Sequence, residues 1–344
     1  AWRHEEGWVG SVSQSAQQQV LRDLDRAFQN WWGGTHRAPT FRARQTAASM
    51  RMPAKECGAP EKLNRRWGQI RLPKLGRIRF RQTRALGGRI RSVTIKRDSG
   101  GRWWIIFLVD TGAAPAARRG GPTIGVDLGV AVSVTVSDGR TFQAPCPGPG
   151  EARRRLRLER RLERQTKGSR SRERTRRQLA RIRSRASARR SDWAHRTANA
   201  LVADGGIVGF EDLDVRKMTG SAAGTNEQPG INVAAKSGLN RAILASGWGQ
   251  VRDFATWKAE RTGALVVRVP AAFTSQRCSA CGHVARTNRE SQAVFRCQSC
   301  GHESKADMNA AINISTAAGH AVAACGDLGP TRSTKHEPSV PLPV

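Results

Sequence analysis

The sequence predicts an α/β fold in which a basic, strand-rich region precedes a mixed-sheet core and a cysteine-rich module. Residues 67–110 alternate apolar and basic side chains, a pattern typical of antiparallel strands. Apolar runs at 123–139, 205–213 and 264–270 are typical of buried strands, and helical patterns separate them. Two Cys-x-x-Cys pairs then stand directly before a helical stretch rich in Ala and Asn. The length of 344 residues suits about two domains.

The charge balance favours a polyanionic partner. The chain carries 59 Lys and Arg against 27 Asp and Glu, which gives a formal net charge of +32. Most of the cations are Arg, whose planar fork binds phosphate through two hydrogen bonds and stacks on bases. A GC-rich genome would also supply Arg in place of Lys, and this explanation has equal weight.

The expected compartment is the cytoplasm. No apolar run reaches the roughly 18 residues of a membrane span, so no membrane partner is expected. The start AWRHEEGWVG is not a signal peptide. Four of the seven cysteines fall in the paired motif, which indicates metal binding in a reducing compartment and not a disulfide framework.

An amphipathic helix is predicted near the N-terminus. Residues 17–32 place an apolar stripe at helical spacing, and Gly33 and Gly34 end the pattern. We expect this stripe to pack in a core or an interface. Base stacking by the pair Trp31 and Trp32 is the alternative.

The predicted sheet at 67–110 should have one apolar and one basic face. Solvation and phosphate binding explain the basic face equally well, and Arg77, Arg79 and Arg81 are its candidate nucleic-acid contacts. The small-residue stretch 111–122 is expected to be a linker.

Residues 151–202 form a long basic region. Between residues 151 and 200 the sequence has 19 Lys and Arg against five Asp and Glu. An apolar stripe from Leu179 to Leu201 favours a helical hairpin that bends at 167–169, and a disordered basic arm is the alternative. The arginines that we expect to contact phosphate are Arg172, Arg174, Arg176, Arg177, Arg181, Arg183 and Arg185.

The rest of the chain is simpler. A Gly/Asn/Ser-rich loop at 218–240 precedes a helix at 240–261 and the strand at 264–270. A last helix begins near residue 305, and the Pro- and charge-rich tail 325–344 is expected to be disordered.

The four paired cysteines predict a structural zinc site. Cys278, Cys281, Cys297 and Cys300 follow the spacing C-x2-C-x15-C-x2-C, which suits four thiolate ligands. A redox pair or an iron–sulfur cluster is the less favoured alternative. Four thiolates would close the coordination shell, so this zinc would hold a small ribbon in shape and perform no chemistry.

Three carboxylates are the candidates for chemistry. Asp127 lies in an apolar strand, Glu211 ends another strand, and Asp307 begins the last helix. An unpaired charge in an apolar strand is costly unless a cation compensates it. A sheet of order βββαβαβα would bring these acids together, where they could hold two Mg²⁺ ions about 3.5–4 Å apart that hydrolyse a phosphodiester.

The segments GVDLGV, GFEDL, TSQRCSACG with CQSCG, and KADMNAAINI resemble the three RuvC motifs and the zinc ribbon of the TnpB family. These are transposon-encoded RNA-guided DNA endonucleases related to compact type V CRISPR effectors. The resemblance implies an RNase H-like (RuvC) nuclease domain and Mg²⁺-dependent cleavage of target DNA. It also implies a bound guide RNA and association with the nucleoid. By the same resemblance, Asp127, Glu211 and Asp307 would be magnesium ligands, and the four paired cysteines would be zinc ligands. A separate transposase encoded by the same element would be a further partner.

The resemblance also implies a domain order. The chain starts almost at the helix that usually follows a further strand segment and helix in this family, so an N-terminally short wedge is expected. The expected parts are a recognition helix and wedge-like β region at 1–110, the linker 111–122, a RuvC core at 123–275 with the basic hairpin 151–202, the zinc ribbon 276–303, a final RuvC helix 304–324 and the tail 325–344.

Three other functions fit parts of the sequence. A DNA-only transposase or junction resolvase would share the three acids. A non-cleaving RNA-guided DNA-binding protein would be expected to lose some of them, whereas all three are present. A plain zinc-ribbon nucleic-acid binder explains the charge and the cysteines but gives Asp127 no purpose.

Overall fold

The computed structural model describes residues 10–41, 48–225 and 227–324. The chain divides into two compact units, Ala1–Ala113 with Gly148–Ala186, and Ala114–Pro147 with Ser187–Val344. The predicted disordered tail lies outside the described residues. Helix α5 (Arg170–Val202) runs through the boundary between the units. Among the described residues, no helix is both long and apolar enough to span a bilayer.

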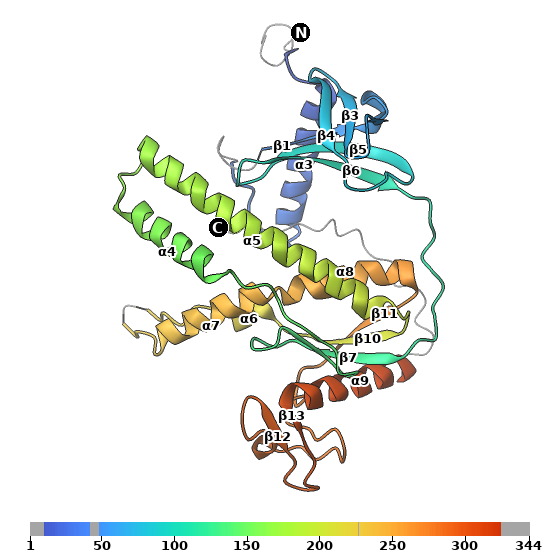
Figure 1. Ribbon diagram of the computed structural model, residues 1–344, viewed down its shortest axis with the longest axis vertical. Coiled ribbons are helices and arrows are strands. Elements are labelled where there is room, and N and C mark those ends of the chain that lie inside the picture. Colours follow the sequence, from blue (N-terminus) through green and yellow to red (C-terminus); the bar gives the residue numbers. More distant parts are fainter. Residues whose placement is uncertain (1–9, 42–47, 226, 325–344) are drawn as a thin grey trace. The chain divides into compact units, whose positions relative to one another are not determined.

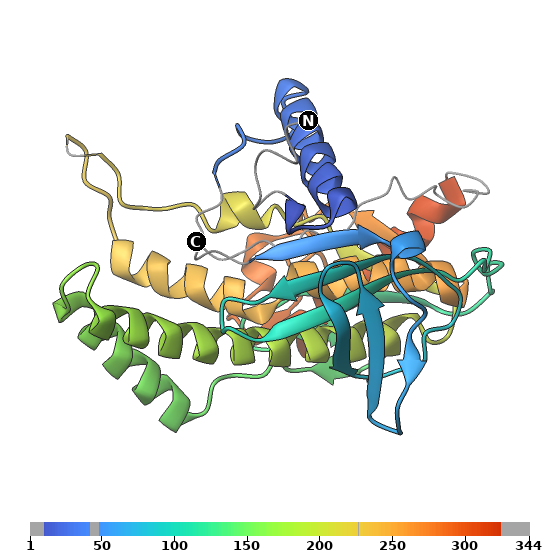
Figure 2. The same ribbon diagram turned by 90° about the horizontal axis from the view of Figure 1, so that it is seen from above.

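The first unit contains two small antiparallel sheets (Figure 2), where the alternating pattern predicted one over residues 67–110. The strand orders are β2-β3-β4 and β1-β5-β6, and one apolar cluster built around Met52, Ile70 and Val93 stabilises them. Their strands are β1 (Ser49–Pro53), β2 (Glu61–Lys62), β3 (Trp67–Leu72), β4 (Gly76–Arg81), β5 (Arg89–Arg97) and β6 (Trp103–Asp110), with a short 3-10 helix η1 (Ala54–Glu56) after β1.

The basic sheet face is present. Along β4, Arg77, Arg79 and Arg81 are exposed while Phe80 is buried, because successive side chains of a strand point to opposite faces. Arg71 on β3 pairs with Arg77 and is also exposed.

The N-terminal helix α3 (Gln14–Trp32) forms as predicted, but its apolar stripe does not pack in the core. Leu21 is 65% exposed and Trp32 is 71% exposed. Only the start of the helix is buried, where Ala16 joins the cluster of the two sheets. The stripe therefore does not pack in a core, and its packing in an interface stays a prediction, because helical periodicity shows that a stripe exists and not what covers it.

The basic region forms a helical hairpin and not a disordered arm. Helix α4 (Pro149–Arg164) is followed by a bend at 165–169 and then by α5 (Figure 1). Leu158, Leu179 and Ile182 are buried between the two helices. The sequence assigned this hairpin to the core at 123–275, whereas its first part, to Ala186, groups with the N-terminal sheets.

The second unit is built on a five-stranded mixed sheet of order β11-β10-β7-β8-β9. Strand β10 pairs in parallel with both β7 and β11, and β7-β8-β9 form an antiparallel meander. This is the strand–strand–strand–helix–strand–helix–strand–helix order predicted above. The strands are β7 (Thr123–Asp127), β8 (Val134–Val136), β9 (Thr141–Phe142), β10 (Ile207–Glu211) and β11 (Leu265–Val269).

The helical region after β10 differs from the prediction. Helix α6 (Val215–Met218) is followed by two helices, α7 (Val233–Ser246) and α8 (Trp248–Thr262), where one helix at 240–261 was expected. Gly247 separates them with a left-handed backbone, φ 74°. The predicted loop at 218–240 is therefore shorter, because α7 begins within it.

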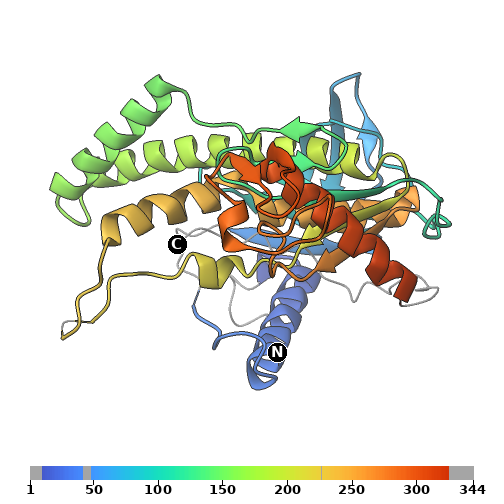
Figure 3. The same ribbon diagram turned by 90° about the horizontal axis from the view of Figure 1, so that it is seen from below.

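The two faces of this sheet have different partners. Ile124, Val126, Val208 and Phe210 point into a cluster that includes the C-terminal part of α5 and helix α8. The residues that alternate with these on β7 and β10 face helix α9 (Ala306–Ala324), which lies along the sheet in Figures 1 and 3. The alternation of a strand therefore assigns every second residue of β7 and β10 to the α9 face.

Candidate functional site

Two carboxylates end neighbouring parallel strands on the same face of the sheet. Val126 of β7 pairs with Phe210 of β10, so the next residues, Asp127 and Glu211, lie side by side. Asp127 is two residues after Gly125, and Glu211 is two residues after Gly209; both glycines face α9. Side chains two residues apart on a strand point to the same face. The two acids therefore also face the side of the sheet that α9 covers.

Helix α9 brings the third carboxylate to this edge. A Cβ at Gly125 would collide with the Ala311 carbonyl oxygen and the Ser315 amide nitrogen, so only glycine permits this close helix–strand contact. Asp307 is one turn before Ala311 on the same side of the helix. Its Oδ2 lies near Gly129, two residues beyond Asp127, at 3.9 Å from where a Cβ at that glycine would be.

The electrostatics show that the three acids share one environment. Burial, together with the charges of Glu211 and Asp307, raises the pKa of Asp127 to about 7. Burial also raises the pKa of Glu211, although a hydrogen bond from Thr274 opposes this. The positive charge of Arg289, which lies between the two cysteine pairs in sequence, partly opposes the rise of both pKa values. A cluster of like charges at low exposure is a place where a cation would be stabilised.

The carboxylate oxygens are neighbours but are not gathered to coordination distance. Within the described ranges, the four cysteines are the only group of three or more acidic, His or Cys residues whose ligand atoms all lie within 4.8 Å of one another. The three acids lie at one edge and face of the sheet, and their convergence on a common metal site stays a prediction. Their type still suits a hard cation such as Mg²⁺, which prefers oxygen ligands.

The raised pKa of Asp127 has a consequence for stability. Its folded pKa of about 7 exceeds the ordinary aspartate value of 3.8, so the folded state binds more protons and loses stability as pH rises between these values. In chelator at pH 8, Asp127→Asn should therefore stabilise the protein, by up to ~4 kcal/mol for a shift of about three pKa units. The gain should be less than half of that at pH 5. Thermal melts of both proteins at the two pH values test this, and an unchanged or lower melting temperature of the variant at pH 8 would contradict it.

A chain of hydrogen bonds that the sequence analysis missed holds this edge together. The Thr274 hydroxyl donates to Glu211, which is 8% exposed. Asn313 of α9 donates to the carbonyls of Thr274, at 2.9 Å, and Arg277, at 2.7 Å. Asn309, one turn earlier, donates to Arg277 and accepts from the Ser279 amide. The available signal was the pair of Asn residues four apart in an Ala-rich helix, because a buried amide needs partners.

The same segment leads directly into the cysteine module. This module contains the antiparallel strands β12 (Val294–Arg296) and β13 (Glu303–Lys305) and a 3-10 turn η2 (Arg286–Asn288). The Ala306 amide, at the start of α9, donates to the carbonyl of Ala293 at 2.9 Å. These hydrogen bonds hold the module against the first two turns of α9, the helix that carries Asp307. The sequence had predicted that this helix begins directly after the cysteine segment.

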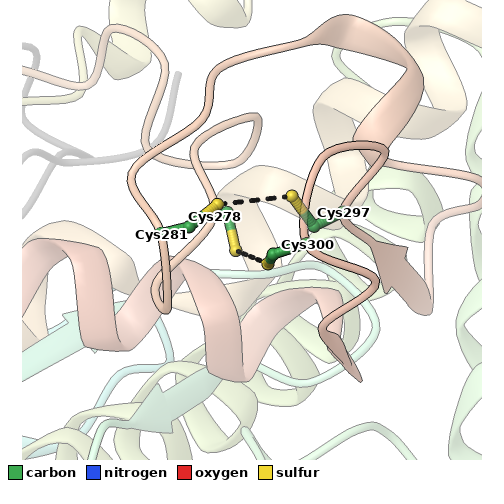
Figure 4. Close-up of side chains that lie close together, drawn as sticks. All are labelled: Cys278, Cys281, Cys297 and Cys300. Carbon is green, nitrogen blue, oxygen red and sulfur yellow. Dashed lines mark hydrogen bonds between the residues drawn. The ribbon is translucent and has the colours of Figure 1, made fainter.

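The four cysteine sulfurs have the spacing of a tetrahedral metal site (Figure 4). The Sγ atoms of Cys278 and Cys300 are 3.7 Å apart, and those of Cys281 and Cys297 are 3.6 Å apart. A tetrahedron with Zn–S bonds of ~2.3 Å has S···S distances of ~3.8 Å. The arrangement fits Zn²⁺.

Each pair of cysteines lies on a matching turn. The Gly282 amide donates to the Cys278 carbonyl at 2.9 Å, and the Gly301 amide donates to the Cys297 carbonyl at 3.0 Å. Both glycines have positive φ, 78° and 73°, as these turns require. The backbone amides of Cys300 and Ser299 lower the pKa of the Cys297 thiol, which favours the thiolate that a metal needs.

The candidate nucleic-acid contacts on α5 are not equally free. Arg172 donates to the carbonyls of Leu162 and Gln165 and so holds the bend of the hairpin. Arg176 and Arg177 pair with Glu173, and Arg183 pairs with Glu159. Within the described chain, no partner is found for three arginines of the set: Arg174, Arg181 and Arg185.

The sheet order, the acids at the edge where α9 begins and the four cysteines define an RNase H-like fold with a cysteine cluster that could hold a metal ion. Residues 106–222 match a family model described as a probable transposase, and residues 248–314 match the Cas12f1-like TNB domain. These two matches include Asp127, Glu211, Asp307 and all four cysteines of the module.

Comparison with individual proteins gives the family. The chain is 38% identical to the putative RNA-guided DNA endonuclease InsQ of Escherichia coli K12, over 98% of this chain and 83% of that protein. It is 29% identical to a putative RNA-guided DNA endonuclease of Streptomyces pristinaespiralis, over 95% of this chain and 77% of that protein. A cryo-EM structure of a Cas12f1–sgRNA–target DNA complex superposes with a TM-score of 0.51 and 14% identity, covering 88% of this chain and 70% of that one. The chain belongs to the TnpB family of transposon-encoded RNA-guided DNA endonucleases.

Proposed function

We propose that this protein is a guide-RNA-directed DNA endonuclease of a transposable element that acts at the bacterial nucleoid and cleaves DNA with divalent cations held by Asp127, Glu211 and Asp307. One observation carries the proposal. Acids from two strand ends and one helix start lie at one edge of the sheet, and burial together with the charges of Glu211 and Asp307 raises the pKa of Asp127 to about 7. Such a cluster is unfavourable in itself and becomes favourable around a cation.

The residues around the acids have separable roles. Mg²⁺ bound there, as two ions, would activate water and stabilise the leaving oxygen of a phosphodiester. Thr274 holds Glu211 in place through its hydroxyl.

Asn309 and Asn313 fix α9, and thereby Asp307, against the segment that precedes the cysteines. Arg289 supplies a positive charge close to Asp127 and Glu211, where a substrate phosphate would lie. Zinc at the four cysteines would keep the ribbon rigid and leave the chemistry to the acids.

The guide RNA and its heteroduplex with target DNA would be held by backbone contacts. In such proteins base pairing reads the sequence, and the protein holds the duplex by its shape and charge. The α5 arginines and the exposed β4 arginines, Arg77, Arg79 and Arg81, are the proposed contacts.

Removing two unpaired α5 cations should change the salt dependence of RNA binding. Each phosphate contact contributes ~0.7–0.9 to the slope of log K against log salt. We therefore expect Arg181→Ala with Arg185→Ala to reduce the slope by ~1.4–1.8. Filter binding between 50 and 300 mM salt measures it. The charge-matched control, Arg216→Ala with Arg261→Ala, removes two exposed arginines elsewhere and should keep the slope. Equal slopes for the two variants would place the contacts elsewhere.

The experiment that tests the whole proposal begins with the RNA that co-purifies with the protein. Sequencing it should give a discrete RNA, and replacing its guide segment should redirect Mg²⁺-dependent cleavage to a matching DNA. Cleavage of DNA without any bound RNA would instead support the DNA-only transposase or resolvase.

A further inference from the structure

A basic cavity lies where α5 begins, at the elbow of the helical hairpin. Its volume is about 570 Å³, within the range of ligand-sized pockets. Six cationic side chains and a single acidic one line it together with Gly168 and Ser169: Lys167, Arg170, Arg172, Arg174, Arg176, Arg177 and Glu173. The two helices of the hairpin pack through Leu158, Leu179 and Ile182, which do not line the cavity. The excess of positive charge in the cavity is therefore not needed to fold the hairpin.

The lining residues fall into two groups with different uses. Glu173 pairs with Arg176 and Arg177, and Arg172 donates to carbonyls at the end of α4, so these side chains are held in place by the protein. Lys167, Arg170 and Arg174 are exposed, and none of the three has a hydrogen-bond or ion-pair partner among the described residues. The side chains that are held by the protein shape the cavity. The three cations without a partner remain available to bind an anionic ligand in it.

We propose that this elbow cavity binds consecutive phosphates of the guide RNA strand. The inference rests on the proposed function, because it takes guide RNA as the partner. It goes further in assigning a discrete site, distinct from a diffuse attraction along α5. A nucleic-acid strand presents one phosphate per ~3.4 Å of its axis, so two neighbouring phosphates can enter one cavity of this size. Arginine forks suit them, because each fork can donate two parallel hydrogen bonds to one phosphate.

The test compares two triple variants that lose the same charge from the same hairpin. The cavity variant is Lys167→Ala, Arg170→Ala and Arg174→Ala. The control is Arg153→Ala, Arg154→Ala and Arg157→Ala, which are exposed on α4 and do not line the cavity. Both are made in the full chain that also carries Asp127→Ala, so that RNA binding is measured without cleavage. Circular dichroism melts check that both fold.

At 0.15 M salt the cavity variant should bind the co-purifying RNA ~10- to 100-fold more weakly than the control, with a salt slope lower by ~2. Restoring Lys at residues 170 and 174 should recover part of the affinity, because Lys keeps the charge and lacks the fork. Equal RNA affinities of the two variants would overturn the inference while leaving the proposed function standing. A parent chain that binds no RNA would overturn both.

A second arm separates RNA from a free oligophosphate, which offers the same chemistry. Inorganic tripolyphosphate is titrated into the parent, the control and the cavity variant by calorimetry. Loss of tripolyphosphate binding in the cavity variant, together with its RNA defect, is the expected result. Loss of tripolyphosphate binding with unchanged RNA affinity would assign the cavity to a free oligophosphate and would overturn the proposal of an RNA strand.

Discussion

Asp127→Ala should abolish guide-directed DNA cleavage while leaving RNA binding nearly intact. The change removes a carboxylate that lies beside Glu211 and in the field of Asp307, so the remaining two acids would hold a cation poorly. Loss of a residue that merely supports a metal ligand costs ~10- to 100-fold. Loss of a ligand itself should therefore exceed ~100-fold in the single-turnover rate, measured at saturating RNA and target DNA.

The control for this prediction is Asp212→Ala. Asp212 follows Glu211 directly but is 59% exposed and pairs with Arg268 on the surface, so its removal should leave the rate within about two-fold. A cleavage rate for Asp127→Ala close to that of Asp212→Ala would refute the assignment of the acidic edge. Unchanged RNA affinity in both variants separates chemistry from binding.

Cys281→Ser should lower zinc content and stability together. The sulfur of Cys281 is one of four that fit a tetrahedral site, and a structural zinc site contributes ~10–16 kcal/mol in small zinc domains. Loss of even a third of that value, at ~2–4 °C per kcal/mol, corresponds to a fall of ~10 °C in melting temperature. Because the ribbon is hydrogen-bonded to the start of α9, cleavage should fall as well, although no acid has been changed.

A matched control is Cys146→Ser, which alters an exposed free cysteine outside the ribbon. It should keep both the metal content and the melting temperature. Zinc is measured by atomic absorption on freshly purified protein, and stability by calorimetry. If Cys281→Ser loses its zinc but melts like Cys146→Ser, the four cysteines do not form a structural site.

Much of the second unit could be predicted because its sequence patterns are local and consistent. The strands around Asp127 and Glu211, and the start of α9, were all found within a few residues. Their meeting point follows from period-two alternation and parallel pairing, which are fixed by short stretches of chain. The helical hairpin was predicted by its apolar stripe despite its charge.

The rest depended on information that no local pattern holds. The stripe of α3 has helical periodicity, yet Leu21 and Trp32 are exposed, because the pattern does not name the surface that would cover them. The break at Gly247 was missed because apolar spacing continues across it from α7 to α8. Thr274, Asn309 and Asn313 were missed because their partners are brought together only by tertiary structure. The spacing of the carboxylate oxygens could not be obtained from sequence for the same reason.

The central claim is that Asp127, Glu211 and Asp307 jointly seat divalent cations, and an anomalous-difference map from crystals grown with Mn²⁺ measures this directly. Manganese suits the same carboxylate ligands as magnesium and scatters anomalously. The account predicts Mn²⁺ peaks at the edge formed by β7, β10 and the start of α9, with oxygens of all three acids as ligands and no such peaks in Asp127→Ala. Crystals that show Mn²⁺ elsewhere, or none within bonding distance of these three carboxylates, would contradict it.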